Sequence, residues 1–270
     1  MSAVAVAPPV REPAPGVVPQ LARAEAWRLL RHPVMLVGFG LWIAITVDSL
    51  RQDLRVVQAF ETITASISFF PGVPAILAAH MVATRDRRAG TVELLSSAPV
   101  RLDARVRALL LASFVPAALA LLLNAALTTA LVVRDEFAQV PTVWHVAQGP
   151  LTVLGACLLG TMIGVWAPSP VAPVVSMVAL VAGHIVIAER GSAQLFGPAV
   201  FWADWGIYDG SIWVGLHPGS APWHLAYVAG LCGLAAAGAL LRVAQRRGPV
   251  LALGVCALAL TVLAGVAQMP

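Results

Sequence analysis

The residues whose types and spacing suit them to chemistry gather in one charged segment, residues 84–107, TRDRRAGTVELLSSAPVRLDARVR, between two apolar runs. Gly90 frees the backbone, Thr91 can cap a helix of roughly two turns, and Pro99 ends it. A short helix with apolar side chains beside arginines suits a groove on a partner, although a solvated loop fits this composition equally well. The candidate contact residues are Arg85, Arg87, Arg88, Gly90, Thr91, Glu93, Leu94 and Leu95.

Other chemistry is sparse in this chain. All 17 basic residues are arginine, so the lysine that a phosphate-binding loop of the Walker type needs is missing, and we expect no ATPase site. No two histidines have the i, i+4 spacing of a metal-binding helix, and no hydrolase triad is indicated. We therefore predict no catalytic residue and no metal site. We interpret His80 and His184 as packing residues, and Cys157, Cys232 and Cys256 as small apolar fillers.

The composition places these residues in a membrane protein. The chain is 59% hydrophobic and only 11% charged, with a mean hydropathy of +0.85, so a soluble domain of this length could not cover its surface with polar groups. We predict an all-α polytopic fold in which a single transmembrane domain, residues 20–268, follows a disordered cytoplasmic tail, residues 1–19. The seven expected spans lie near residues 33–50, 62–83, 108–133, 146–166, 171–188, 223–241 and 249–268.

The distribution of arginine predicts the orientation of these spans. With the N-terminus in the cytoplasm, 13 of the 17 arginines lie on the inner side, whereas eight of the 13 acids lie outside. We therefore expect a multi-pass protein of the bacterial cytoplasmic membrane whose C-terminus is outside. The basic inner rim would contact membrane lipid, whereas no basic stripe interleaved with aromatic residues indicates binding of nucleic acid.

The stretch before the first span, residues 20–32 (QLARAEAWRLLRH), predicts an amphipathic helix that lies flat at the inner interface. A helical wheel places Trp27 and Leu29 on its apolar side, and Glu25 and Arg28 on its polar side. A plain cytoplasmic extension of the first span is the alternative interpretation. The residues assigned to the interface are Trp27, Arg28, Leu30 and Arg31.

Prolines interrupt the second span at Pro71, Gly72 and Pro74, where missing N–H groups predict a kink. Such a kink can act as a hinge or can simply pack against its neighbours. Gly160 and Gly164, in the fourth span, predict a close approach to another helix, either of this chain or of another subunit. The residues assigned to a candidate pathway through the spans are Phe70, Asn124 and Thr128.

The longest segment expected outside, residues 189–222, is too polar to span the bilayer and too aromatic to float free in water. Short helices at the outer interface would satisfy both properties and could form an outer gate. An ordinary aromatic belt that anchors two spans fits the same residues. The candidate gate residues are Trp202, Trp205, Tyr208 and Trp213.

The order of these parts resembles the membrane (permease) subunits of type-2 ABC transporters, which are mostly exporters. The likeness covers residues 20–247, and its most specific part is the pattern Arg-x-x-Gly-Thr-x-Glu-Leu-Leu followed by Pro, at residues 87–99. In that family this loop is the coupling helix, seated on the nucleotide-binding subunit. Members usually have six spans, so the apolar run at residues 249–268 implies either an appended seventh helix or a miscount within residues 189–222.

The resemblance implies an export permease that moves a hydrophobic or amphipathic cargo. It also implies two copies of a separate ABC ATPase subunit and a second permease protomer, identical or homologous. ATP and Mg would be bound by the ATPase subunit, and no cofactor by this chain. Two alternatives stay open: a membrane-embedded enzyme whose histidines act near the outer leaflet, and a scaffold or immunity protein without transport activity.

Overall fold

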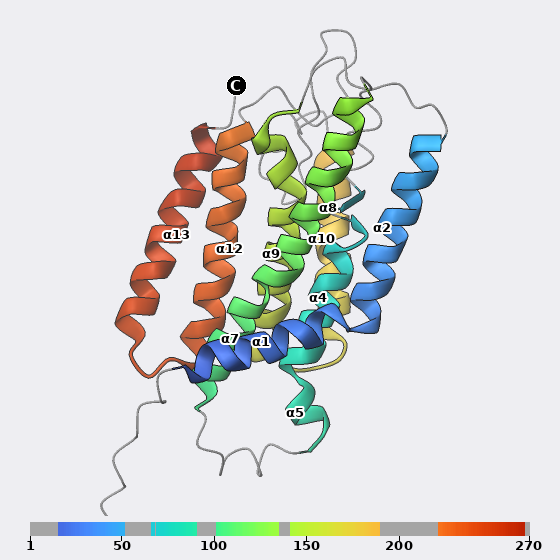
Figure 1. Ribbon diagram of the computed structural model, residues 1–270. Helices are drawn as coiled ribbons and strands as arrows, with labels where there is room; N and C mark the ends of the chain where they lie inside the picture. The colour runs from blue at the N-terminus through green and yellow to red at the C-terminus, as the bar shows by residue number, and fades with distance from the viewer. Residues whose placement is uncertain are drawn as a thin grey trace, which may run out of the picture.

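The computed structural model describes residues 16–51, 66–67, 69–90, 101–134, 141–189 and 221–267. Within these ranges the chain is helical and contains no strand, which confirms the all-α prediction for the described residues. Most helices run side by side along one axis, and the first lies across one end of the bundle (Figure 1). In chain order they are α1 (Val17–Leu30), α2 (Pro33–Arg51), α4 (Gly72–Ala83), α5 (Arg85–Arg88), α7 (Leu102–Ala112), α8 (Phe114–Val133), α9 (Val143–Trp166), α10 (Ala172–Glu189), α12 (Ala221–Val243) and α13 (Arg247–Ala267).

The lengths and compositions of these helices are those of membrane spans. Four helical stretches among the described residues are long and apolar enough to cross a bilayer: Leu102–Val133, Val143–Trp166, Pro222–Val243 and Arg247–Ala267. The pair formed by α1 and α2 passes the same test but is bent by 57°. Since α4 has only 12 residues, the total of seven spans stays a prediction.

Proline positions explain where two helices begin. α2 begins at Pro33, as the sequence predicts, because a missing N–H removes no intrahelical bond in the first turn. Pro19 lies in the first turn of α1 for the same reason, and α1 begins at Val17. The tail predicted for residues 1–19 is therefore wrong at its last three residues, which are helical.

The third predicted span consists of two helices instead of one continuous run from residue 108. α7 begins at Leu102 and ends at Ala112, and α8 begins after Ser113. Pro116 lies in the first turn of α8 and cannot donate a backbone bond to the preceding turn. The break between α7 and α8 follows from that missing donor. At the break, Ser113 donates to the Leu109 carbonyl through both its backbone N–H, at 3.1 Å, and its hydroxyl, at 3.0 Å.

Helix α9 lies at the centre of the packing and contacts α4, α8 and α12. An added Cβ on Gly160 would lie 2.3 Å from the Ile76 carbonyl oxygen, and one on Gly164 would lie 2.9 Å from the Ala83 Cβ. Both glycines of α9 therefore face α4, which settles a question that the sequence leaves open. The close approach predicted for these glycines is made within one chain.

Helix α13 packs mainly against α12 and forms one edge of the bundle (Figure 1). Large apolar side chains on its outward side are exposed, among them Val255, Leu263 and Val266. A helix with such a face is stable only where lipid or another apolar surface covers it. This exposure agrees with a membrane-embedded bundle.

One end of the bundle is rich in arginine, and we call it the arginine-rich end. α1 and α5 lie there, together with the start of α7 and the connection between α12 and α13 (Figure 1). α13 ends at the opposite end of the bundle. The described arginines that belong to the arginine-rich end are Arg23, Arg28, Arg31, Arg85, Arg87, Arg88, Arg101, Arg105, Arg107, Arg242, Arg246 and Arg247.

Candidate functional site

The charged segment begins with α5, which extends beyond the rest of the bundle at the arginine-rich end (Figure 1). Thr84 joins α4 to α5, and its hydroxyl donates a hydrogen bond of 2.8 Å to the His80 carbonyl. After α5 the chain turns at Gly90, whose φ of 65° is a left-handed conformation that favours glycine. The backbone freedom predicted for Gly90 is therefore used at the end of α5.

A buried carboxylate ties α5 to α1. Glu25 of α1 is only 4% exposed, and its two oxygens accept hydrogen bonds of 2.5 and 2.8 Å from the two Nη atoms of Arg85. Arg28 donates to the same carboxylate at 2.8 Å. The planar guanidinium of Arg85 matches the carboxylate in a two-pronged geometry that fixes orientation as well as distance. α1 and α5, 60 residues apart in the chain, are thus held in one arrangement.

Two further acids continue this network toward α7. Asp86 accepts a bond of 3.1 Å from Arg85 Nε and forms a longer ion pair, 3.5 Å, with Arg105 of α7. Asp103, in the first turn of α7, pairs with Arg101 at 3.0 Å. The ion pairs therefore connect α1, α5 and α7, three elements that meet at the arginine-rich end.

The pKa of Arg85 reflects two opposing effects. Burial disfavours the charged guanidinium, but the hydrogen bonds and charge of Glu25, together with nearby Asp86, outweigh burial and raise the pKa of Arg85. A group with a raised pKa contributes stability that is lost only as the pH rises through that value. Arg85 therefore stays charged throughout the physiological range.

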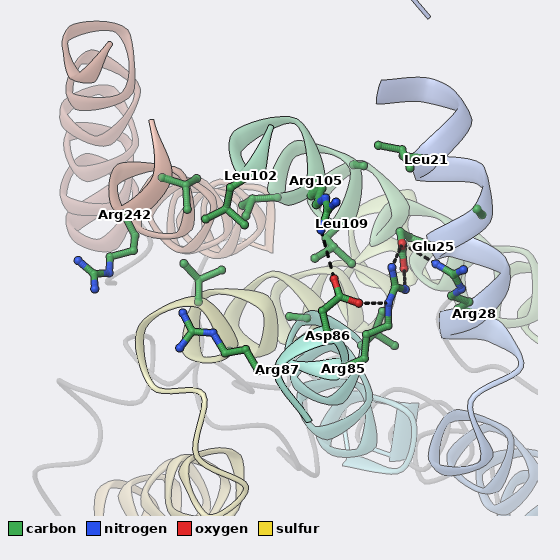
Figure 2. Close-up of a pocket in the computed structure, with 18 residues that line it drawn as sticks. Leu21, Glu25, Arg28, Arg85, Asp86, Arg87, Leu102, Arg105, Leu109 and Arg242 are labelled. Atoms are coloured by element: carbon green, nitrogen blue, oxygen red, sulfur yellow. Dashed lines mark hydrogen bonds and ion pairs between the residues drawn. The ribbon is translucent and has the colours of Figure 1, made fainter. Parts of the chain in front are cut away.

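A cavity of about 450 Å³ lies beside this network (Figure 2). Its walls come from α1, α4, α5, α7, α9 and α12, so it collects side chains from both halves of the sequence. Five arginines line it against two carboxylates, Glu25 and Asp86, which leaves a net charge of +3. Apolar side chains, among them Leu21, Leu102 and Leu109, complete the lining. The cavity is therefore basic and amphipathic.

Comparisons of this chain with protein-family models, curated proteins and solved structures found no match. The likeness to a transporter family therefore rests on the motif and the order of parts in the sequence. The geometry adds a basic cavity and an ion-pair network, both at the end of the bundle from which α5 extends.

The structure describes the first part of the predicted docking segment, up to Gly90. Arg85 faces α1, whereas Arg87 and Arg88 are exposed, and the Arg88 guanidinium donates to the Met81 carbonyl. The remaining predicted contact residues, Thr91, Glu93, Leu94 and Leu95, lie outside the described residues. So do the predicted gate residues Trp202, Trp205, Tyr208 and Trp213.

The residues assigned to a hinge lie at an interruption of the helix. Phe70 and Pro71 form a turn, and α4 begins at Gly72, so the predicted kink is present as a break before α4. α2 approaches this break closely, since an added Cβ on Gly38 would lie 2.6 Å from the Phe70 carbonyl oxygen. Movement at Pro71, Gly72 and Pro74 stays a prediction.

Two of the three predicted pathway residues, Asn124 and Thr128, are buried polar side chains of α8. Asn124 is fully buried, and its amide donates a hydrogen bond of 2.7 Å to the Val146 carbonyl. Thr128 lies one turn further along the same face of α8 and is 6% exposed. Phe70 packs against the apolar core. Passage of a cargo along these residues stays a prediction.

His80 is a packing residue, as predicted, because it is buried and its Nε2 forms a hydrogen bond of 3.2 Å with the Ala167 carbonyl. Cys157 and Cys232 are also buried, whereas Cys256 is exposed on α13. The side chain of His184 lies outside the described residues. Among the described residues, no three His, Cys, Asp or Glu side chains are grouped as a metal site would require.

The helical wheel of α1 is wrong at Glu25. Trp27 is 55% exposed and lies beneath the Arg31 guanidinium, 4.1 Å from its ring centre, and its place at the membrane interface stays a prediction. Glu25, predicted on the polar side, is buried beside Leu29 because Arg85 neutralises it. Positions 25 and 29 are one helical turn apart, so the spacing itself indicates that Glu25 shares the buried stripe.

Sequence reasoning also missed Asp86, Arg105 and Arg242 as lining residues of the cavity. Each lies in or beside a charged run at a predicted span boundary, which is the only signal the sequence offers for them. Their convergence depends on how α5, α7 and α12 pack, and no local pattern encodes that packing.

The bend between α1 and α2 contains a histidine, His32, beside the start of α2. His32 Nδ1 accepts a hydrogen bond of 3.3 Å from the Val34 N–H at the start of α2. Burial, and then the positive charge of Arg88, lowers the pKa of His32 below its ordinary value of 6.5. Because the folded state disfavours the proton, the stabilising contribution is complete above 6.5 and is lost as the pH falls through the lowered pKa.

We therefore expect the midpoint of thermal unfolding to fall between pH 7.5 and pH 5, and His32→Gln to reduce that fall. Thermal unfolding of both proteins in detergent at the two pH values measures the difference. An identical fall in the two proteins would show that other groups account for the acid sensitivity.

Proposed function

We propose that the chain is the membrane-spanning permease subunit of an ATP-driven type-2 ABC exporter in the bacterial cytoplasmic membrane. One observation carries the proposal: α5, from which the Arg-x-x-Gly-Thr-x-Glu-Leu-Leu motif continues, is bonded to α1 through Arg85 and Glu25. A partner that binds the motif would act on an element already tied to α1. The exposed Arg87 and Arg88 suit contact with such a partner.

The proposed topology has seven spans. They are α2, the span that ends in α4, the pair α7 and α8, then α9, α10, α12 and α13. The N-terminus lies inside and the C-terminus outside, because this orientation keeps the arginine-rich end in the cytoplasm. α1 then lies flat at the inner leaflet, which agrees with its position across the end of the bundle (Figure 1).

In the assembled exporter, two ATPase subunits bind ATP and Mg, and a second permease protomer completes the membrane part. Closure of the ATPase subunits displaces α5, and the Arg85–Glu25 pair transmits that displacement to α1. The break before α4 serves as the hinge, at Pro71, Gly72 and Pro74. A hydrophobic or amphipathic cargo then passes between the protomers, and the aromatic residues within 189–222 control the outer exit.

A charge placed in the docking motif tests the proposal. Leu94→Asp should abolish stimulation of the co-purified ATPase subunit while leaving membrane insertion intact, because an apolar contact is replaced by a charge. Gly248→Asp is the matched control: it lies at the same end of the bundle, and an added Cβ there meets nothing within 4 Å. ATP hydrolysis by each purified complex in lipid is the measurement.

Two results would contradict the proposal. One is unchanged stimulation in Leu94→Asp, which would remove the docking role from the motif. The other is turnover of a substrate by the purified chain without any nucleotidase, which is the result that a membrane-embedded enzyme would give.

A further inference from the structure

The lining of the basic cavity carries more positive charge than its own carboxylates neutralise. Arg85 and Arg28 bind Glu25, and Arg105 pairs with Asp86, so both carboxylates of the lining are engaged. Within the described part of the chain, neither Arg87 nor Arg242 forms an ion pair. Figure 2 shows both on the side of the cavity away from Glu25, with their guanidinium groups outside the network. Two arginines are therefore left to bind an anion.

The rest of the lining suits a ligand that has an apolar part as well as a charge. Leu21 of α1, and Leu102 and Leu109 of α7, present apolar surface to the same cavity, and Leu102 is 62% exposed. A cavity of about 450 Å³ lies within the usual size range of small-molecule sites, about 300 to 1,000 Å³, and is far larger than one phosphate ion needs. The site suits a molecule that has an anionic group joined to an apolar part.

The position of the cavity indicates where such a molecule comes from. α1, which forms one wall, lies across the end of a bundle whose long helices have the length of membrane spans (Figure 1). In a bilayer crossed by these helices, lipid phosphates would meet acyl chains at that end of the bundle. Arginine binds phosphate through several N–H donors in a fixed plane. Trp166, at the end of α9, lies beside α12, and the Arg242 guanidinium is 5.5 Å from its ring centre. Tryptophan is typical of the membrane interface.

We propose that this cavity binds the phosphate group of an anionic membrane lipid. Arg87 and Arg242 contact the phosphate, and Leu21, Leu102 and Leu109 contact the glycerol and the first part of the acyl chains. The site is more specific than a general attraction between a basic rim and a charged leaflet, because its two phosphate ligands come from α5 and α12. It does not depend on the proposed function, since it needs neither a partner subunit nor nucleotide.

Titration of the purified full chain with fluorescent phosphatidylglycerol in phosphatidylcholine-containing micelles tests the site. The variant Arg87→Gln/Arg242→Gln should raise the Kd about 100-fold, because each charged hydrogen bond to the phosphate contributes about a tenfold factor. The matched control Arg246→Gln/Arg247→Gln removes the same charge at the same end of the bundle but outside the cavity lining. Its Kd should stay close to that of the unchanged chain.

A second variant keeps the test independent of charge and of folding. Leu102→Gln replaces an exposed apolar side chain of the lining and should also weaken binding, with no change in the thermal midpoint. Equal weakening by the two double variants would overturn the proposal, since it would mean general attraction to the rim. No loss of binding in Leu102→Gln would overturn the contact with the apolar part.

Competition separates a lipid phosphate from a free one. Unlabelled phosphatidylglycerol should displace the probe, whereas phosphatidylcholine and inorganic phosphate at the same concentration should not. Displacement by inorganic phosphate as effective as that by the lipid would overturn the lipid assignment. None of these measurements involves ATP, so their failure is distinguishable from failure of the exporter proposal.

Discussion

Glu25→Ala should lower the free energy of unfolding by about 2 kcal/mol, because it leaves Arg85 beside a buried position without its carboxylate. Removal of one partner from a fully buried pair costs about 3 to 5 kcal/mol, and the smaller value here allows for the Arg85 side chain, which is 37% exposed. Denaturant unfolding of the purified chain in detergent measures the change. The reason lies in α1: its carboxylate is only 4% exposed and accepts three hydrogen bonds from arginines.

The matched control for this prediction is Arg28→Gln. Arg28 also binds Glu25, but its side chain is 53% exposed, so the loss should be less than about 0.5 kcal/mol. The double variant Glu25→Leu/Arg85→Leu should recover most of the stability, since an apolar pair needs no charge compensation. If the double variant loses as much stability as Glu25→Leu and Arg85→Leu lose together when made singly, the two side chains do not act as a pair.

Gly160→Ala should destabilise the bundle by about 3 kcal/mol, although alanine is the better helix former. The new Cβ would lie 2.3 Å from the Ile76 carbonyl oxygen, an approach that only movement of α4 or α9 can relieve. The contacted atom belongs to the backbone, so no side-chain rotation helps. We expect α4, and the break before it, to shift with the substitution.

Gly183→Ala in α10 supplies the comparison, because an added Cβ there meets nothing within 4 Å. That variant should be neutral or more stable by up to about 1 kcal/mol, as expected for alanine in place of glycine within a helix. The thermal midpoints of both variants in one detergent give the result. A Gly160→Ala protein as stable as Gly183→Ala would mean that α4 and α9 do not pack at this distance.

The sequence predicts the helices well where one strong local signal decides them. Apolar runs of span length locate α9, α12 and α13, and Pro33 marks the start of α2. The pair of prolines after Phe70 predicts the break before α4. Each of these features depends on residues within a few positions of one another, so a reading along the chain is sufficient.

The candidate site is harder to predict because it depends on long-range packing. Nothing near Glu25 indicates that its partner is Arg85, and Arg242 reaches the cavity only because α12 lies against α9. A charged residue on a helical wheel is ordinarily assigned to the solvent-facing side, and for this reason the wheel predicts the wrong side of α1 for Glu25. A buried acid is stable where a distant residue neutralises it, and that residue is known only from the fold.

Helix α13 lies outside the candidate site. It packs mainly against α12, and none of its residues, Arg247–Ala267, lines the cavity or takes part in the ion pairs that join α1, α5 and α7. The helices that build the site and helix α13 can therefore diverge at different rates. Only lipid and α12 constrain substitutions in α13, whereas a change at Glu25 or Arg85 requires a matching change in another helix.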